Sequence, residues 1–213
     1  MPGYRQWFLQ QDLQPAYAFH RRFLQHLQER ENRRRWVLKA PTHMFANPAL
    51  LSVYPDALFV QTHRTPADAM ASVSSLVTIL RSAFSDAVDR FVVCREAIEY
   101  WSETMEKFLH ERDRLADNRI CDIQYDEIRR EPIGAVRRIY EYFGWTLSRE
   151  AEQRMRGLVA SQAERQSANH RYDLSQFGSS AQEVLSVFAT YCQRFGLAQP
   201  NGVQQKQAAR SIA

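Results

Sequence analysis

The chain has 213 residues, of which 45% are apolar and 24% charged, and 28 basic against 24 acidic residues give a formal net charge of +4. This is ordinary globular composition for one domain with a sizeable core. The charge is mild and the acids are interspersed, so we weigh a nucleic-acid-binding module that uses Arg21, Arg22 and Arg33–Arg35 only as a remote alternative.

The three cysteines, Cys94, Cys121 and Cys192, are isolated along the chain and odd in number. They form neither a disulfide framework nor a metal-binding cluster, which favours a reducing compartment. Nothing resembles a secretory signal, and no apolar run approaches the roughly 18 residues of a membrane-spanning helix. We therefore expect a soluble, cytoplasmic protein.

The N-terminal region is predicted to be helical after Pro15. Apolar residues recur at helical spacing on one face, at Ala16, Phe19, Phe23, Leu24 and Leu27. The basic run Arg33–Arg35 follows, and we interpret it as a solvated turn, with a phosphate contact as the alternative.

The segment from position 36 to position 72 predicts strand, polar turn and helix twice in succession. The strand Trp36–Leu38 leads to Lys39 and His43, and the strand Leu58–Val60 leads to His63 and Arg64. Two successive βα units imply parallel neighbouring strands, whose carboxyl ends meet at the edge where open α/β sheets bind ligands. We therefore expect the cations that follow the two strands to converge on one polyanionic ligand.

Four side chains in this segment are candidates for chemistry. Alone, Lys39 is more simply a solvent-facing strand end and His43 an exposed or structural histidine. Together they supply a fixed cation and a group that takes a proton near neutral pH. Arg64 precedes a helix N-terminus, an arrangement suited to phosphate, and Ser72 follows two helical turns later.

Helices and one further strand are predicted for the rest of the chain. Thr65 and Asp68 suggest a capping box for a helix that runs to about Arg81. A long helix from Asp86 to about Leu115 and a strand at Ile120–Tyr125 follow. Two helices are then predicted, from Pro132 to Gly144 and from Ser148 to Val159. The last helix runs from Ala181 to Phe195 and begins after a capping box formed by Ser180 and Glu183.

The ordered series of these motifs resembles the PAPS-dependent sulfotransferase family, and most closely its bacterial branch with the K-x-P-x-H motif. The motif is K-A-P-T-H at 39–43, followed by Y-P-D-A-L-F-V-Q-T-H-R-T-P at 54–66 and then Ser72. By resemblance, Lys39 stabilises the transferring sulfuryl group and His43 is the base. Arg64 and Ser72 then bind the 3′-phosphate of 3′-phosphoadenosine 5′-phosphosulfate (PAPS).

Two later segments extend the resemblance, so that it covers the chain from about Trp7 to Phe195. The strand-end residue Tyr125, before an acidic pair and Pro132, implies a contact with adenine. His170 and Arg171, in N-H-R-Y at 169–172, resemble the loop that closes over the nucleotide, with an ordinary surface loop as the alternative.

Family members also carry a P-R-S/T-G-T-T loop that holds the 5′-phosphosulfate, and this sequence has no such motif. We therefore expect residues 1–198 to correspond to the C-terminal two-thirds of the family fold, N-terminally truncated, with residues 199–213 as a flexible tail. The expected fold is α/β, a short parallel sheet flanked by helices, related to P-loop nucleotide hydrolases.

The resemblance implies sulfuryl transfer from PAPS to a hydroxyl or amine, without a metal. The alternative is an inactive sulfotransferase-like module that binds adenosine 3′,5′-bisphosphate. The acceptor is not encoded in a readable motif, but we expect the N-terminal helix and the loop after His43 to contribute to its choice.

Overall fold

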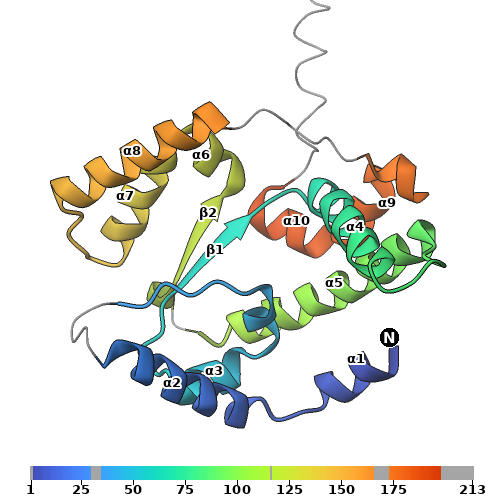
Figure 1. Cartoon of the computed structure of the whole chain (residues 1–213), viewed down its shortest axis with the longest axis horizontal. Helices are drawn as coiled ribbons and strands as arrows, with labels where there is room; N and C mark the ends of the chain where they lie inside the picture. Colours follow the sequence, from blue (N-terminus) through green and yellow to red (C-terminus); the bar gives the residue numbers. More distant parts are fainter. Residues whose placement is uncertain (1, 30–34, 116, 166–172, 198–213) are drawn as a thin grey trace, which may run out of the picture. The chain divides into compact units, whose positions relative to one another are not determined.

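The computed structural model describes residues 2–29, 35–115, 117–165 and 173–197 (Figure 1). The chain divides into two compact units. Unit 1 comprises Met1–Leu58 and Thr104–Arg119, and unit 2 comprises Phe59–Glu103 and Ile120–Ala213.

The sheet of unit 2 has two parallel strands among the described residues. Strand β1 spans Phe59–His63 and strand β2 spans Ile120–Gln124, and each residue of one pairs with the corresponding residue of the other. Parallel strands need a long crossover between them, and its described part here contains two α-helices and a 3-10 helix. The pairing agrees with the predicted α/β class, a short parallel sheet flanked by helices.

Trp36–Leu38 does not form the strand that the sequence predicts. The described residues hold one sheet, made of β1 and β2, and residues 35–40 have no regular structure. Val37 is 91% exposed. An apolar segment becomes a strand only where a neighbouring strand pairs with its backbone N–H and C=O groups. The strand of the first predicted βα unit is therefore wrong, whereas its helix is present at Asn47–Val53, and β1 pairs with β2.

Strand β2 lies at the centre of a buried cluster in unit 2. Cys121 is 1% exposed and Ile123 is fully buried, and both belong to one apolar cluster with Ala135 of helix α7 (Pro132–Tyr142). Three partly buried apolar side chains pack against this cluster: Ile128, Ile139 and Phe143. The chain leaves α7 through Gly144, whose φ of +65° suits glycine at a helix end, as predicted.

Helix α4 spans Pro66–Ser82 and begins directly after β1. Proline in its first turn costs no hydrogen bond, because the first helical N–H groups lack intrahelical partners. Thr65 is the N-cap, but its side chain makes no capping bond, so the predicted capping box with Asp68 is not formed. Asp68 still places a negative charge at the positive end of the helix dipole.

Helix α5 (Arg90–Arg112) runs from unit 2 into unit 1 and is shorter at both ends than predicted. Its apolar side chains are buried to different extents. Cys94 and Phe108 are buried, whereas Phe91 is 45% exposed. Two further helices of unit 2 are α6 (Tyr125–Arg130) and α8 (Arg149–Arg165).

The C-terminal helix predicted over positions 181–195 is two helices, α9 (Ala181–Val187) and α10 (Ala189–Phe195), after the short 3-10 helix η3 (Leu174–Phe177). The predicted capping box is present: Glu183 N–H donates to Ser180 Oγ at 3.2 Å, and Ser180 N–H donates to Glu183 Oε2 at 2.9 Å. The break falls at a buried phenylalanine, position 188, and α9 and η3 both pack on α4.

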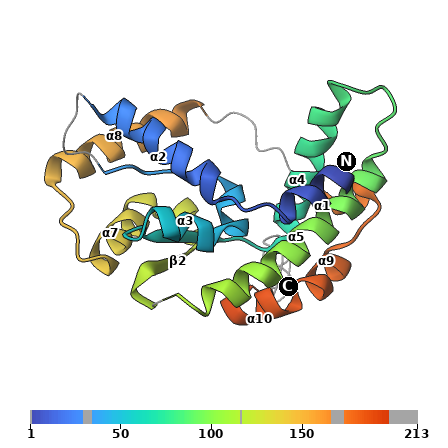
Figure 2. The ribbon, with the colours of Figure 1, turned by 90° about the horizontal axis from the view of Figure 1, so that it is seen from below.

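Unit 1 is helical in its described part. Its elements are α1 (Pro2–Leu9), α2 (Gln14–Gln28), the 3-10 helix η1 (Pro41–Phe45), α3 (Asn47–Val53), the 3-10 helix η2 (Asp117–Arg119) and the last part of α5. Helices α2 and α3 lie side by side, as the ribbon shows from two directions (Figures 1 and 2). Of the predicted apolar face of α2, only Leu24 is buried.

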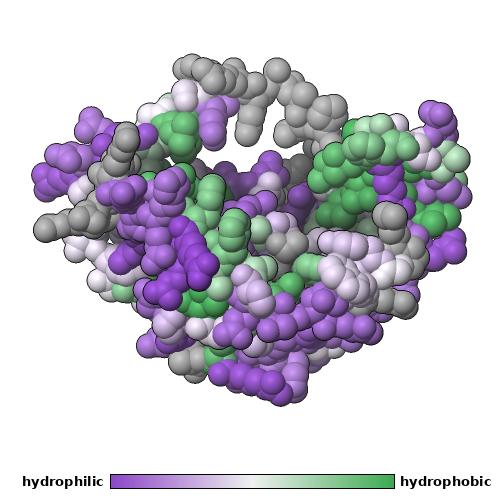
Figure 3. Space-filling model, turned by 60° about the horizontal axis from the view of Figure 1, so that its bottom comes forward, coloured by the Kyte–Doolittle hydropathy of each residue, from purple (hydrophilic) through white to green (hydrophobic). Residues whose placement is uncertain are grey.

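Both units expose large apolar side chains. On α2, Phe19 is 72% exposed and Phe23 and Leu27 are each 52% exposed, while the second half of α4 exposes Leu76 and Ile79. The space-filling view shows such apolar surface in green among purple polar side chains (Figure 3). None of the helices in the described ranges combines the length and the apolar character needed to cross a membrane.

Candidate functional site

The parallel pairing of β1 and β2 brings two predicted site residues together in unit 2. His63 lies opposite Gln124 at the end of the sheet, so the next residues, Arg64 and Tyr125, leave the two strands side by side. The Arg64 guanidinium carbon lies 5.0 Å from the centre of the Tyr125 ring, a cation–π distance. Among the described residues Arg64 has no carboxylate partner, so its N–H donors can bind a ligand anion.

His63 is buried beneath this pair, with 1% of its surface exposed. Its Nε2 lies 2.7 Å from Asp122 Oδ1 of β2, and its Nδ1 lies 2.9 Å from Tyr191 Oη of α10. A neutral imidazole that donates from Nε2 and accepts from the tyrosine hydroxyl satisfies both contacts. Phe195 stacks on the ring at 3.9 Å between centroids. The sequence predicts that His63 lies in a polar turn after the strand, whereas it is the last residue of β1 and part of the core.

Two serines of α4 differ in their surroundings. The predicted ligand Ser72 is half-buried, and at a rise of about 1.5 Å per residue it lies roughly 10 Å along the axis from Thr65. Ser74 is fully buried, and its hydroxyl has no hydrogen-bond partner in the described structure. Of these two serines Ser72 is the more accessible, so it suits a ligand contact better than Ser74.

Lys39 and His43 lie in unit 1. Lys39 is exposed in the irregular segment just before η1, and Ala40 is extended with φ of −148° and ψ of 133°. The chain then turns, because Pro41 begins η1 and the His43 N–H donates to the Ala40 carbonyl at 3.2 Å. No hydrogen bond joins Lys39 to His43 in the described residues. The expected convergence of this pair with Arg64 stays a prediction.

His43 is half-buried and its ring contacts α2. Its Nδ1 lies 2.9 Å from Tyr17 Oη, with 5.8 Å between the ring centroids. Burial lowers the pKa of His43 below its usual value, and the charge of His20 lowers it further. A lowered pKa keeps the imidazole neutral at pH 7, which is the form that can accept a proton.

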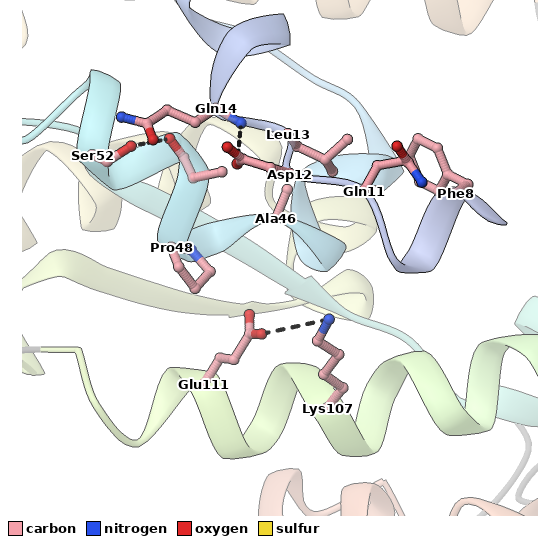
Figure 4. Close-up of a pocket in the computed structure, with 11 residues that line it drawn as sticks. Phe8, Gln11, Asp12, Leu13, Gln14, Ala46, Pro48, Ser52, Lys107 and Glu111 are labelled. Carbon is pink, nitrogen blue, oxygen red and sulfur yellow. Dashed lines mark hydrogen bonds and ion pairs between the residues drawn. The ribbon is translucent and has the colours of Figure 1, made fainter. Parts of the chain in front are cut away.

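A pocket of about 350 Å³ opens in unit 1 near these residues (Figure 4). Its walls are the α1–α2 junction, the start of α3, and Lys107 and Glu111 of α5. Leu13, on the pocket wall, precedes Tyr17 by one turn of α2, and Ala46 follows His43 by three residues. The pocket therefore lies about one helical turn from the His43–Tyr17 contact.

Glu111 gives this pocket an unsatisfied acceptor. Its Oε1 lies 3.9 Å from Lys107 Nζ, whereas its Oε2 is buried and has no partner among the described residues. Burial raises the pKa of Glu111 above its usual value, against the opposing charge of Lys107. A ligand hydroxyl or ammonium group could donate to this oxygen.

Two predicted site residues, His170 and Arg171, lie outside the described residues, as does the predicted tail 199–213. Within the described ranges, His, Cys, Asp and Glu side chains do not gather in any group of three or more that could hold a metal ion.

Sequence reasoning missed Tyr17 and the bonding of His63. Tyr17 was part of a helix interpreted only by its apolar residues, and no spacing rule connects it to His43, 26 residues away. For His63 a signal existed, because a histidine that ends an apolar parallel strand is expected to be buried there. Its partners Asp122 and Tyr191 come from distant segments, which the sequence alone does not connect.

The amino-acid sequence of this chain is similar to those of known sulfotransferases. Residues 5–149 match the model of the sulfotransferase family. The chain is 28% identical over 129 residues to omega-hydroxy-beta-dihydromenaquinone-9 sulfotransferase Stf3 of Mycobacterium tuberculosis and of Mycobacterium bovis. That match covers 58% of this chain and 32% of the relative.

Two solved structures resemble the fold over most of this chain. The crystal structure of sulfotransferase STF9 from Mycobacterium avium matches 90% of this chain at 30% identity with a TM-score of 0.81. That of STF1 from M. tuberculosis matches 89% at 35% identity with a TM-score of 0.74. This chain covers 49% and 48% of those two chains, so it spans about half the length of the solved relatives and a third of the curated ones.

The buried His63 contacts generate a prediction about stability. Replacing Asp122 with alanine leaves the Nε2–H of His63 unpaired in the core, and we expect a loss of about 1 to 3 kcal/mol in the free energy of unfolding. Asp122→Asn retains an oxygen that can accept this bond and should lose clearly less. Urea denaturation at pH 8 measures both. Equal losses would show that Asp122 does not act through His63.

Proposed function

Because the chain belongs to the sulfotransferase family, we propose that it binds PAPS and transfers its sulfuryl group to a hydroxyl or amine acceptor. The observation that carries the proposal is the placement of Arg64 and Tyr125 side by side, just past the ends of two paired parallel strands. Ligands of open α/β sheets bind at this edge.

The nucleotide's 3′-phosphate is assigned to Arg64 and Ser72. Arg64 offers a planar fork of N–H donors that suits a phosphate, and it lies one residue before the N-cap of α4, where the helix dipole also favours an anion. The adenine is assigned to Tyr125. Because the guanidinium of Arg64 already occupies one face of that ring, the base would contact its other face or its edge. His170 and Arg171 are proposed to close over the nucleotide.

In the proposed transfer, the acceptor oxygen or nitrogen attacks the sulfur of PAPS. The bond from sulfur to the bridging oxygen breaks, and adenosine 3′,5′-bisphosphate leaves with the electron pair. His43 takes the proton that the acceptor loses, and Lys39 stabilises the negative charge that develops on the bridging oxygen. As in phosphoryl transfer, positioning and charge stabilisation supply most of the rate.

The pocket of unit 1 is the proposed acceptor site. Its lining includes Leu13, one turn before Tyr17, and Ala46, three residues after His43, together with Lys107 and Glu111 of α5. Apolar side chains such as Phe8 and Leu13 would contact the body of the acceptor, and Glu111 Oε2 would accept a hydrogen bond from it. The name of the Stf3 relative describes a hydroxylated menaquinone, which supports an apolar molecule with a hydroxyl group as the acceptor class.

A module that binds adenosine 3′,5′-bisphosphate without transfer is the second candidate. It rests on the same observation, because the placement of Arg64 beside Tyr125 bears on nucleotide binding and not on transfer. Both candidates require the same nucleotide site, so they differ in transfer and not in binding.

Calorimetric titration with adenosine 3′,5′-bisphosphate tests the nucleotide site. We expect Arg64→Ala to weaken binding by roughly tenfold to a hundredfold, because a charge-assisted bond to the phosphate is lost. Arg154→Ala removes an exposed arginine of α8 and serves as the matched control, with unchanged affinity expected. Equal affinities of the wild-type protein and both variants would exclude Arg64 from the site.

Transfer is tested with radiolabelled PAPS and geraniol, an apolar primary alcohol, with geranylamine as the amine counterpart. Lys39→Ala should reduce the rate at least about a hundredfold while leaving nucleotide affinity nearly unchanged, because charge stabilisation acts in the transition state. Lys39→Arg keeps the charge and should lose less.

The transfer rate should also depend on pH. It should fall as the pH drops through the pKa of His43, which lies below 6.5, because protonated His43 cannot act as a base.

The binding and transfer experiments together distinguish the two candidates and test the mechanism. Nucleotide binding without any transfer to either acceptor supports the binding module. Transfer that survives Lys39→Ala contradicts the assigned mechanism, even if the nucleotide binds as proposed.

A further inference from the structure

Two tyrosine–histidine pairs lie together between α2, η1 and α3 in unit 1. Tyr17 Oη is 2.9 Å from Nδ1 of His43, and Tyr54 Oη is 2.7 Å from Nδ1 of His20. The pairs touch, because the ring of His20 meets that of Tyr17 edge-on with 6.3 Å between centroids. His43 is therefore held by an aromatic cluster and not only by its own short helix.

The contact with Tyr17 leaves one nitrogen of His43 available. Nδ1 is engaged, whereas Nε2 has no hydrogen-bond partner among the described residues. A histidine acts as a base only through a nitrogen that carries no proton, so Nε2 can be the base only if the ring proton is on Nδ1. In that tautomer the Nδ1–H donates and the Tyr17 oxygen accepts.

Nδ1–H of His43 can donate to Tyr17 both before and after the base takes a proton. After taking a proton, the imidazolium carries N–H groups at both positions and still donates from Nδ1 to Tyr17. No reorientation of the tyrosine is then needed during transfer. The half-exposed side chain of Tyr17 can donate its own hydroxyl proton to water.

We propose that Tyr17 is a positioning residue for His43: its hydroxyl oxygen accepts a hydrogen bond from Nδ1–H, fixes the ring, and keeps the lone pair of Nε2 directed to the acceptor. This inference rests on the proposed function, in which His43 is the base. It gives a residue of α2 the role of orienting the assigned base, which lies in η1.

A tyrosine in this role differs physically from a carboxylate. A carboxylate at Nδ1 would stabilise the imidazolium and raise the pKa of His43. The groups that face His43 are the neutral Tyr17 of α2 and, beyond it, His20, which is paired with Tyr54 of α3. Burial and His20 lower the pKa of His43, so the ring is oriented without becoming charged at neutral pH.

Two-bond 1H–15N NMR spectra of the full chain at pH 8 report which ring nitrogen carries the proton. We expect His43 of the wild-type protein to be predominantly the Nδ1–H tautomer. In Tyr17→Phe, which keeps the ring and removes only the oxygen, His43 should change to the Nε2–H form that free imidazole side chains prefer. Tyr54→Phe is the matched control, because it removes the hydroxyl of the other pair and should leave the His43 tautomer unchanged.

Kinetics give a second readout that a purely structural role would not move. With radiolabelled PAPS and geraniol, Tyr17→Phe should lower kcat/KM by roughly tenfold to a hundredfold, within the range of acid–base catalysis. The affinity for adenosine 3′,5′-bisphosphate and the midpoint of urea unfolding should stay close to those of the wild-type protein. An unchanged kcat/KM in Tyr17→Phe would overturn the proposal.

The NMR result also separates this inference from the proposed function. A wild-type His43 in the Nε2–H form, accepting at Nδ1 from Tyr17, would overturn the role of Tyr17 even if transfer is observed. Full transfer by His43→Ala would instead remove His43 as the base, whatever its tautomer. If the wild-type chain transfers nothing, the proposed activity fails, and the spectra alone decide whether Tyr17 sets the ring proton.

Discussion

The parallel pairing of β1 with β2 is the constraint on which the proposed nucleotide site depends. The two strands join positions about sixty residues apart, and their common register places the residue after each strand at the same edge. Arg64 and Tyr125 meet for this reason and not because of any local motif. His63 of β1 stabilises this pairing, because its ring is hydrogen-bonded to the neighbouring strand and to α10.

This arrangement places a buried, fully bonded side chain next to a half-buried one that is proposed to bind the ligand. His63 has both ring nitrogens engaged and is stacked on Phe195, so the backbone that follows it is held in place. Arg64 emerges from that fixed position with its guanidinium on an aromatic ring and without a carboxylate partner among the described residues. Rigid support for a charged side chain lowers the entropy cost of ordering that side chain when a ligand binds.

Much of the local structure was predictable because it depends on short-range chemistry. Strand β2, the proline that starts α4, the capping box at Ser180 and the glycine after α7 follow from residue types at fixed spacing. The strand at Trp36–Leu38 was wrong because strand formation depends on a partner, which local sequence does not report. The break at Phe188 was missed because two short helices and one longer helix share the same apolar periodicity.

The site residues likewise include some that the sequence predicts and some that only the packing of distant segments reveals. Arg64 and Tyr125 were predictable as strand-end residues, and the structure brings them together. The contact of Tyr17 with His43 depends on packing between elements 26 residues apart, for which the sequence has no signal. The roles of Lys39 at the sulfuryl group and of His43 as the base remain predictions, supported by the family match and by the physical chemistry of the two side chains.

The central claim is that a nucleotide with a 3′-phosphate binds at the carboxyl ends of β1 and β2. Backbone amide chemical-shift mapping during titration with adenosine 3′,5′-bisphosphate tests it residue by residue. The account predicts that the largest changes cluster at Arg64, Ser72 and Tyr125, and that adenosine 5′-monophosphate, which lacks the 3′-phosphate, produces much smaller changes at Arg64. Changes confined to other residues, or equal changes with both nucleotides, would contradict it.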